Sequence, residues 1–238
     1  MSPDFNPLEF ARLAESLHSA MTPVETAEQV VAFAVTELDA DSGGITLALG
    51  RGLESLAASD ALAEKMAAVQ AELDEGPGRD SAHEHTLQCP NLADESRWPR
   101  WTTQALAVGV RSMLAADMTD IDGRRIGSLS LYWCRPRNFT ASEVAYVEIA
   151  RRHAAVALAN SLNVTNLNLA LDTRKRIGQA QGILMERYGL DEARAFEVLR
   201  RYSMEHNIKL RQVAEVLVSS RQLPDTGAPE APDRDAST

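Results

Sequence analysis

Cationic side chains stand in three groups near the C-terminus of this sequence, at spacings suited to binding phosphate. They are Arg174, Lys175 and Arg176, then Arg200 and Arg201, then Lys209 and Arg211. Guanidinium and ammonium groups bind phosphate through charge-assisted hydrogen bonds, and the free N–H groups of a helix start add to such a site. We expect a last helix to begin near Asn207, with Lys209 and Arg211 at its start. The pattern predicts a phosphate-binding surface, with a solvated basic surface as the alternative.

The charge of the chain is unevenly distributed. The 238 residues carry a formal net charge of −10, which argues against an unspecific nucleic-acid binder. Residues 172–211 instead hold 9 Lys and Arg against 6 Asp and Glu. Contact with phosphate is therefore expected in this one segment.

Two glycines interrupt the same helical segment. Gly178 and Gly182 lie one turn apart, and each costs about 1 kcal/mol relative to alanine inside a helix. The charged flanks exclude a membrane helix pair, and GQAQG does not match a phosphate-binding loop. We expect the glycines to allow close packing of another helix.

Other groups of reactive residues give weaker indications. His83, Glu84 and His85 could offer two imidazoles to a metal, but without a third ligand apart from Cys89 we expect no metal site. Cys89 and Cys134 form no CxxC pattern, which suits a reducing compartment. No arrangement of residues indicates catalysis, so neither an enzyme nor a cofactor is expected.

The sequence also bears on location and on ligand binding. MSPDFNPLEF lacks the features of an export signal, and no run of about 18 apolar residues occurs. We expect a cytoplasmic protein that does not contact a membrane. Trp98, Trp101 and Tyr132 could line a ligand pocket, with ordinary core packing as the alternative.

The N-terminal part alternates between helical and extended patterns. Thr22 and Glu25 form a capping box for a helix to about Leu38, and Asp122-Gly123 indicates a hairpin. We expect 79–97 to be irregular, apart from a strand near 84–88. The expected helices are one opening at Asn6-Pro7 and others over 22–38, 58–74 and 98–108; the expected strands are 45–49, after a Gly43-Gly44 connector, 53–57, 111–118 and 125–134.

The C-terminal part is predicted to be helical. Thr140 and Glu143 start a helix whose pattern continues through 156–171, where leucines approach a coiled-coil spacing. Further helices are expected at 172–188, 191–205 and 209–220, with Tyr188 and Tyr202 packed rather than stacking on bases. The tail 224–238 is expected to be disordered. The expected core of these helices is Ile177, Leu184, Ala195, Phe196, Leu199, Val213, Ala214 and Leu217.

The order of elements up to residue 155 resembles a GAF sensor domain. The residues that carry this resemblance are DEGPG (74–78) with the polar loop after it, WPRW (98–101), and the pair VRSMLAADM and IGSLSLYW within 110–133. The resemblance implies an antiparallel sheet with flanking helices and an unknown small-molecule or protein signal.

Residues 171–218 resemble an ANTAR domain almost from end to end. The matching elements are RKRIGQAQGILMERYGL, EARAFEVLRRYS and HNIKLRQVAEVLV. The family is a three-helix RNA-binding module that prevents transcription termination by binding paired hairpins in leader RNA, usually as a dimer. Gln181 departs from it, since lysine is common there. The resemblance and the charges together imply an RNA surface formed by Lys175, Arg176, Gln179, Arg187, Arg200, Arg201, Asn207, Lys209 and Arg211.

The sequence therefore predicts four regions: a GAF-like domain over 1–155, a helical linker over 156–171, an ANTAR domain over 172–223 and the tail 224–238. The expected function is signal-controlled antitermination through tandem RNA hairpins, with a homodimer formed through the long helix. A DNA-binding transcription factor with a GAF ligand sensor is the main alternative, because three short helices with a basic last one also suit a helix-turn-helix. A ligand-processing GAF enzyme and a protein–protein adaptor are further alternatives.

Overall fold

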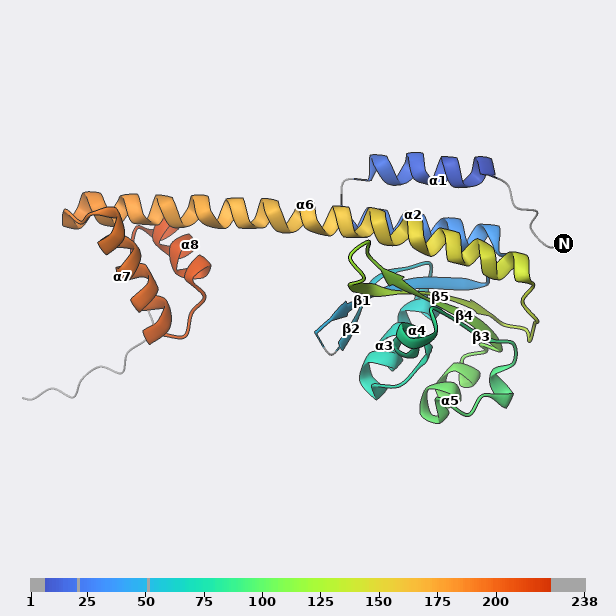
Figure 1. Ribbon diagram of the computed structural model, residues 1–238. Coiled ribbons are helices and arrows are strands. Elements are labelled where there is room, and N and C mark those ends of the chain that lie inside the picture. The colour runs from blue at the N-terminus through green and yellow to red at the C-terminus, as the bar shows by residue number, and fades with distance from the viewer. Residues whose placement is uncertain (1–6, 21, 51, 224–238) are drawn as a thin grey trace, which may run out of the picture. The chain divides into compact units, whose positions relative to one another are not determined.

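The computed structural model of the protein describes residues 7–20, 22–50 and 52–223. The chain divides into two compact units, residues 1–165 and 166–238. The first unit has an α+β fold and the second is helical, as the sequence predicts (Figure 1).

Within the described residues of the first unit, five strands form one antiparallel sheet in the order β2-β1-β5-β4-β3 (Figure 1). The predicted hairpin at Asp122-Gly123 is confirmed: Asp120 N–H donates to the Arg124 carbonyl at 2.9 Å, and Gly123 has a φ of 79°. The strands are β1 (Ser42–Leu49), β2 (Gly52–Ala58), β3 (Thr86–Cys89), β4 (Ser112–Thr119) and β5 (Arg125–Trp133).

Strand β5 is central and has two different faces. Leu129, Leu131 and Trp133 belong to the hydrophobic core on one face of the sheet, while the alternate residues Ser128, Ser130 and Tyr132 are buried on the other face. Thr46 on β1 is paired with Ser128, and their hydroxyls share a hydrogen bond of 2.9 Å. Gly127 is required nearby, because a Cβ there would lie 1.8 Å from the Thr46 carbonyl oxygen.

Helices cover both faces of this sheet (Figure 1). One face packs on α1 (Pro7–Ser19), α2 (Pro23–Glu37) and the first part of α6 (Ala141–Tyr188). The other face packs on α3 (Ala61–Leu73), α4 (Pro77–Glu84) and α5 (Pro99–Ala107), with a short 3-10 turn at Leu92–Asp94. The two cores follow from the alternation of apolar side chains along each strand.

Both predicted capping boxes are present. Glu25 N–H donates to Thr22 Oγ1 at 3.1 Å, and Thr22 N–H donates to the Glu25 carboxylate at 3.3 Å. At the start of α6, Thr140 and Glu143 make the same reciprocal bonds at 2.8 and 3.2 Å. These caps pair donors that a helix start leaves free, and so fix where α2 and α6 begin.

Two local predictions are wrong. Gly43 and Gly44 lie inside β1 rather than in a connector; a Cβ at Gly43 would lie 2.8 Å from side-chain atoms of Val35 and Leu131, so the glycine lets α2 and the sheet approach closely. Residues 77–84 form helix α4 where an irregular segment is expected. Pro77 suits the first position of a helix, and Gly78 N–H donates to the buried Gln70 side chain at 2.7 Å.

Helix α6 is one element of 48 residues, so the boundary expected near residue 172 does not exist. A continuous helix through 156–171 is as predicted. Between Pro136 and Pro224 the sequence has no proline to break it. The division between the two compact units falls at 165/166, inside the predicted linker. The predicted disordered tail, 224–238, lies outside the described residues.

Candidate nucleic-acid interface

In the second unit, the end of α6 packs with α7 (Glu192–Glu205) and α8 (Leu210–Ser220). Six predicted core residues are buried together with Ala180: Leu184, Ala195, Leu199, Val213, Ala214 and Leu217. Ile177 packs partly against this cluster. Phe196 does not belong to it, so its assignment to the core is wrong; it lines a surface groove instead.

Short turns fix where these helices begin. Gly189, with a φ of 64°, follows the last residue of α6, and Asp191 caps α7 by accepting the Arg194 N–H at 2.8 Å. Asn207 adopts a φ of 51° between α7 and α8, a conformation that asparagine tolerates better than most residues. Lys209 then occupies the N-cap of α8 without a side-chain cap. The first N–H groups of α8 therefore follow a lysine, as the phosphate-binding prediction requires.

The two helix glycines are not packing sites within the described residues, which contradicts the expectation. Apart from the neighbouring backbone of α6 itself, a Cβ at Gly178 or Gly182 would meet no heavy atom within 4 Å, and both residues are exposed. The expectation assumed that the cost of a glycine must be offset by a neighbouring helix. Here α7 and α8 pack on the side of α6 that carries Ala180 and Leu184.

A groove of about 940 Å³ lies among the three helices of this unit. Its lining includes Leu169, Arg174 and Ile177 of α6. Phe196 of α7 and Arg211 of α8 also line it. Gln181 spans two of these helices, because its side-chain amide donates to the Glu192 carbonyl at 3.1 Å. Of the residues that line this groove, the RNA contact set expected from the sequence includes Arg211 but not Arg174, although Arg174 stands beside Lys175 in the same basic group.

The predicted cations do not all line that groove. Arg200 and Arg201 on α7 line a second hollow, of about 660 Å³, with Tyr202. Each pairs with a glutamate of its own helix: Arg200 with Glu197 at 2.7 Å and Arg201 with Glu205 at 2.9 Å. Such exposed pairs contribute little and are readily exchanged for phosphate.

Gln179 and Arg187 lie elsewhere on the unit. Gln179 lines a third hollow with Gly182 and Glu186. Arg187 donates to the Arg221 carbonyl at 2.7 Å, at the end of α8, which gives it a structural contact that its assignment to RNA did not foresee. Lys175 and Arg176 are exposed on α6.

The two tyrosines differ. Tyr188 is 61% exposed, so its expected packing is wrong. Tyr202 packs partly against the core and stacks on His206, with ring centroids 4.1 Å apart, as expected for a packing residue.

In the first unit, the three aromatic residues predicted to contact a ligand are closed off from solvent. Trp98 and Trp101 meet edge to face with centroids 6.1 Å apart, and Trp98 Nε1 donates to Asp80 at 2.6 Å. Burial raises the pKa of Tyr132 to about 12. Among the described residues, Trp101 Nε1 has no hydrogen-bond partner.

The candidate metal ligands and the two cysteines all belong to the first unit. The side chains of His83 and Glu84 lie outside the described residues, and the rest of the described part has no group of three metal-binding side chains. Burial, followed by the nearby Glu95, raises the pKa of the Cys89 thiol to about 12, whereas Cys134 is exposed. A thiol with such a pKa is a poor nucleophile. No described helix is long and apolar enough to cross a membrane.

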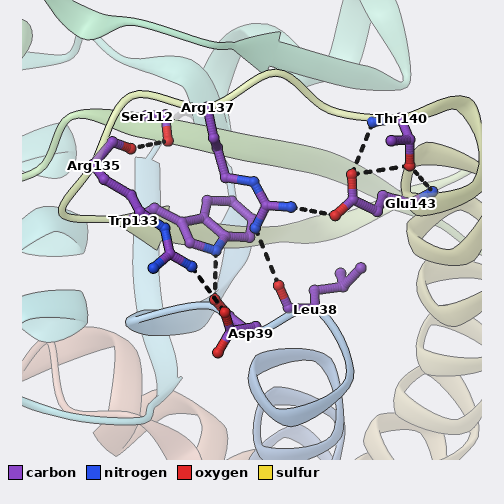
Figure 2. Close-up of polar contacts among 8 residues, drawn as sticks. All are labelled: Leu38, Asp39, Ser112, Trp133, Arg135, Arg137, Thr140 and Glu143. Carbon is purple, nitrogen blue, oxygen red and sulfur yellow. Dashed lines mark hydrogen bonds and ion pairs between the residues drawn. The ribbon is translucent and has the colours of Figure 1, made fainter. Parts of the chain in front are cut away.

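A polar junction fixes the start of α6 to the sheet and to the end of α2 (Figure 2). Arg137 donates to the Leu38 carbonyl at 3.3 Å and to the carboxylate of Glu143, and its guanidinium lies 4.7 Å from the centre of the Trp133 ring. Trp133 Nε1 donates to the Asp39 carbonyl at 2.7 Å. This junction joins β5, α2 and α6.

Comparison with known proteins decides the family. The GAF domain family matches residues 20–159, and the ANTAR domain family matches residues 165–218. The chain is a GAF-domain protein with a C-terminal ANTAR domain. Both are regulator-type domains, and together they support assignment as a regulatory protein with a sensor domain.

Curated relatives match part of this GAF–ANTAR chain. It is 27% identical over 105 residues to the transcriptional regulatory protein PdtaR in two strains of Mycobacterium tuberculosis. That match covers 44% of this chain and 50% of PdtaR, so the chain spans about half the length of the curated relatives it matches.

Solved structures resemble the GAF–ANTAR chain in fold. The GAF domain of an Acinetobacter phosphoenolpyruvate-protein phosphotransferase is 15% identical with a TM-score of 0.56, covering 68% of this chain and 99% of its own. The corresponding domain from Coxiella burnetii is 13% identical with a TM-score of 0.54, covering 67% and 95%. At these identities the likeness concerns the fold alone.

Proposed function

We propose that this protein is a signal-responsive transcription antitermination regulator that binds hairpins in nascent RNA through its ANTAR domain. The observation that carries the proposal is the ANTAR match over residues 165–218, on the one basic segment of an acidic chain. PdtaR, which matches over part of its length, is named as a transcriptional regulatory protein. We place this antitermination activity in the cytoplasm, where transcripts are made.

The chemistry of the ANTAR unit suits RNA. Its exposed cations take phosphates, which supply most of the affinity and make it depend on salt. Sequence is read at unpaired bases of the loops through stacking and hydrogen bonds. Nine residues form the proposed contact set: Lys175, Arg176, Gln179, Arg187, Arg200, Arg201, Asn207, Lys209 and Arg211.

A homodimer through α6 is part of the proposal. Val164, Leu167 and Leu171 alternate at spacings of three and four along this helix, and each is more than half exposed. Such a seam is typical of a coiled coil. Two ANTAR domains in one dimer would hold the two hairpins of a tandem pair. Single cysteines along 158–171 that give the same crosslinks with and without the signal would argue against control through this helix.

The GAF domain is proposed to control the output in response to an unidentified small molecule or protein. The polar junction at the start of α6 supports this role, since it connects that helix to β5 and to α2. A change in the sensor that moved this junction would turn or shift α6.

The decisive experiment compares nucleic acids at physiological salt. A gel shift with tandem-hairpin RNA and with duplex DNA separates our proposal from a DNA-binding transcription factor. We expect hairpin RNA to bind at least ten times more tightly than duplex DNA. A transcription assay on a template with a leader terminator should then show increased readthrough. Equal binding to both nucleic acids would refute the proposal.

A further inference from the structure

The groove lined by α6, α7 and α8 includes two large apolar side chains, Ile177 and Phe196, which we call its apolar floor. Phe196 and Ile177 both line it; Phe196 is partly exposed and lies outside the core cluster. A flat aromatic side chain left open in a groove offers a stacking surface to a partner. The volume, about 940 Å³, is large enough for a nucleotide.

The charges around this floor have opposite signs in different places. Arg174 and Arg211 supply guanidinium groups from α6 and α8, whereas Asp191 and Glu192 supply carboxylates at the start of α7. Among the described residues, Arg174 enters no ion pair, and Arg211 has only a loose one with Glu215, at 3.6 Å. Both guanidinium groups can therefore bind an anion without breaking a strong ion pair.

The carboxylates of Asp191 and Glu192 differ in their hydrogen-bond partners. Asp191 is used as the cap of α7 and lies 3.6 Å from Arg194. The Glu192 carboxylate has no hydrogen-bond partner among the described residues, although the backbone carbonyl of Glu192 is held by Gln181. Glu192 therefore keeps a free acceptor beside the apolar floor.

This combination is complementary to a nucleotide. A phosphate needs cations, the faces of a base need an apolar or aromatic surface, and the N–H groups on the edge of a base need an acceptor. Guanine matches best, because its N1–H and its N2 amino group are adjacent donors that one carboxylate can accept together. Uracil offers one N–H between two carbonyl groups, and a carboxylate would repel those carbonyl oxygens.

We propose that this groove binds one unpaired guanosine of the hairpin loop, with its phosphate on Arg174 and Arg211, its base on Phe196 and Ile177, and its edge on Glu192. This inference rests on the proposed RNA-binding function and assigns the part of the surface that selects sequence. Of its five residues, only Arg211 belongs to the contact set given above.

The test uses the full-length protein and synthetic stem–loop RNAs with a fixed stem and a randomised loop. Selection for binding yields a preferred loop, in which each guanosine is then replaced by inosine, which lacks the N2 amino group, or by an abasic residue. We expect one guanosine whose replacement by inosine weakens binding several-fold and whose removal weakens it about ten-fold, as for loss of one stacked base.

Two groove variants should abolish that preference. Glu192→Gln should bind the guanosine and inosine RNAs equally, and Phe196→Leu should no longer distinguish the base from the abasic residue. The matched controls are residues of α6 that do not line the groove. Glu186→Gln removes one negative charge, as Glu192→Gln does, and Tyr188→Leu removes an aromatic ring, as Phe196→Leu does. Both controls should keep the full preference.

The outcomes separate this inference from the proposed function. If the protein binds none of the stem–loops, the proposed function fails and the inference fails with it. If it binds them but both groove variants keep the preference for guanosine, only the inference is overturned. If the variants instead change the oligomeric state and leave the preference intact, the groove holds a second copy of the chain. Circular dichroism checks folding, and Glu192→Gln, an exposed change, decides the matter if Phe196→Leu does not fold.

Discussion

Gln181 on α6 donates its side-chain amide to the backbone carbonyl of Glu192 on α7, at 3.1 Å. It stands where the ANTAR resemblance leads one to expect a lysine that could contact RNA. In this chain the residue instead links two helices of the module. Gln181→Ala should lower the free energy of unfolding by about 0.5–1.5 kcal/mol, because one hydrogen bond is lost.

Chemical denaturation followed by circular dichroism measures this effect. Gln179→Ala, an exposed glutamine two residues earlier, is the control and should change stability by less than about 0.5 kcal/mol. Equal losses in the two variants would mean that the contact with Glu192 contributes nothing.

Gly178 and Gly182 of α6 should lower the stability of the isolated chain. Gly178→Ala and Gly182→Ala each add a methyl group that meets no atom within 4 Å other than the neighbouring backbone of α6, so each should raise the free energy of unfolding by roughly 0.5–1 kcal/mol. Thermal melting at low protein concentration tests this. A lower melting temperature would show that something packs closely against these glycines in solution, for example a second copy of the chain.

The cations of the proposed RNA surface should be recognisable by their salt dependence. Replacing Arg201, Lys209 and Arg211 together with glutamine should weaken hairpin binding and flatten the plot of log affinity against log salt concentration. Each lost phosphate contact should reduce the slope by about 0.7–0.9. Arg124→Gln, at the exposed hairpin turn of the GAF domain, is the control. An unchanged slope with the fold intact would contradict a phosphate role for the three residues.

Arg137 should be a large contributor to the stability of the GAF domain. Arg137→Met leaves the buried carboxylate of Glu143 without its cation and the Leu38 carbonyl without that donor, which should cost about 3 kcal/mol. Arg135→Met breaks a pair with Asp39 in which both side chains are largely exposed, and should cost less than about 1 kcal/mol.

A second substitution separates charge from packing at this junction. Glu143→Gln added to Arg137→Met removes the unpaired charge and should recover part of the loss, as measured by denaturant unfolding. No recovery would mean that Arg137 acts mainly by packing on Trp133 and Phe139.

Glu148 should make the GAF domain sensitive to acid. Burial alone would raise its pKa, but hydrogen bonds from Arg151 and Thr86 outweigh burial and lower the pKa below the ordinary value of 4.5. The folded state then binds fewer protons than the unfolded state, so this stabilisation is complete above about pH 5 and is lost as the pH falls through the lowered value. Glu148→Gln should be less stable than the natural chain at pH 7, and the difference should shrink by pH 3. Unfolding free energies across this range measure it, and a constant difference would refute the assignment.

Local signals in the sequence predicted much of the fold correctly. The Thr22–Glu25 and Thr140–Glu143 pairs placed the starts of α2 and α6, because a capping box requires only residues within one turn. The extended pattern of 125–134 correctly predicted strand β5. Periodicity also found most of the core of the ANTAR unit, since its helices are amphipathic.

The failures involve tertiary contacts. Gly43 and Gly44 look like a connector in sequence but allow close packing inside β1, and α4 depends partly on Gln70, which lies eight residues before Gly78. Phe196 has the spacing of a core residue, yet the core cluster closes without it. Periodicity gives the direction of a side chain, but whether the neighbouring helices reach it depends on their packing.

The serines of β5 affect how the sheet assembles. If β5 slipped by one residue against β1, hydroxyl groups would be pressed among the leucines beneath α2, while leucines would replace them opposite Thr46. The same slip would move a side chain into the space where only Gly127 fits. A misaligned intermediate would therefore contain a steric clash and buried hydroxyl groups without hydrogen-bond partners. Residues of the central strand thus disfavour wrong strand pairings while the domain folds.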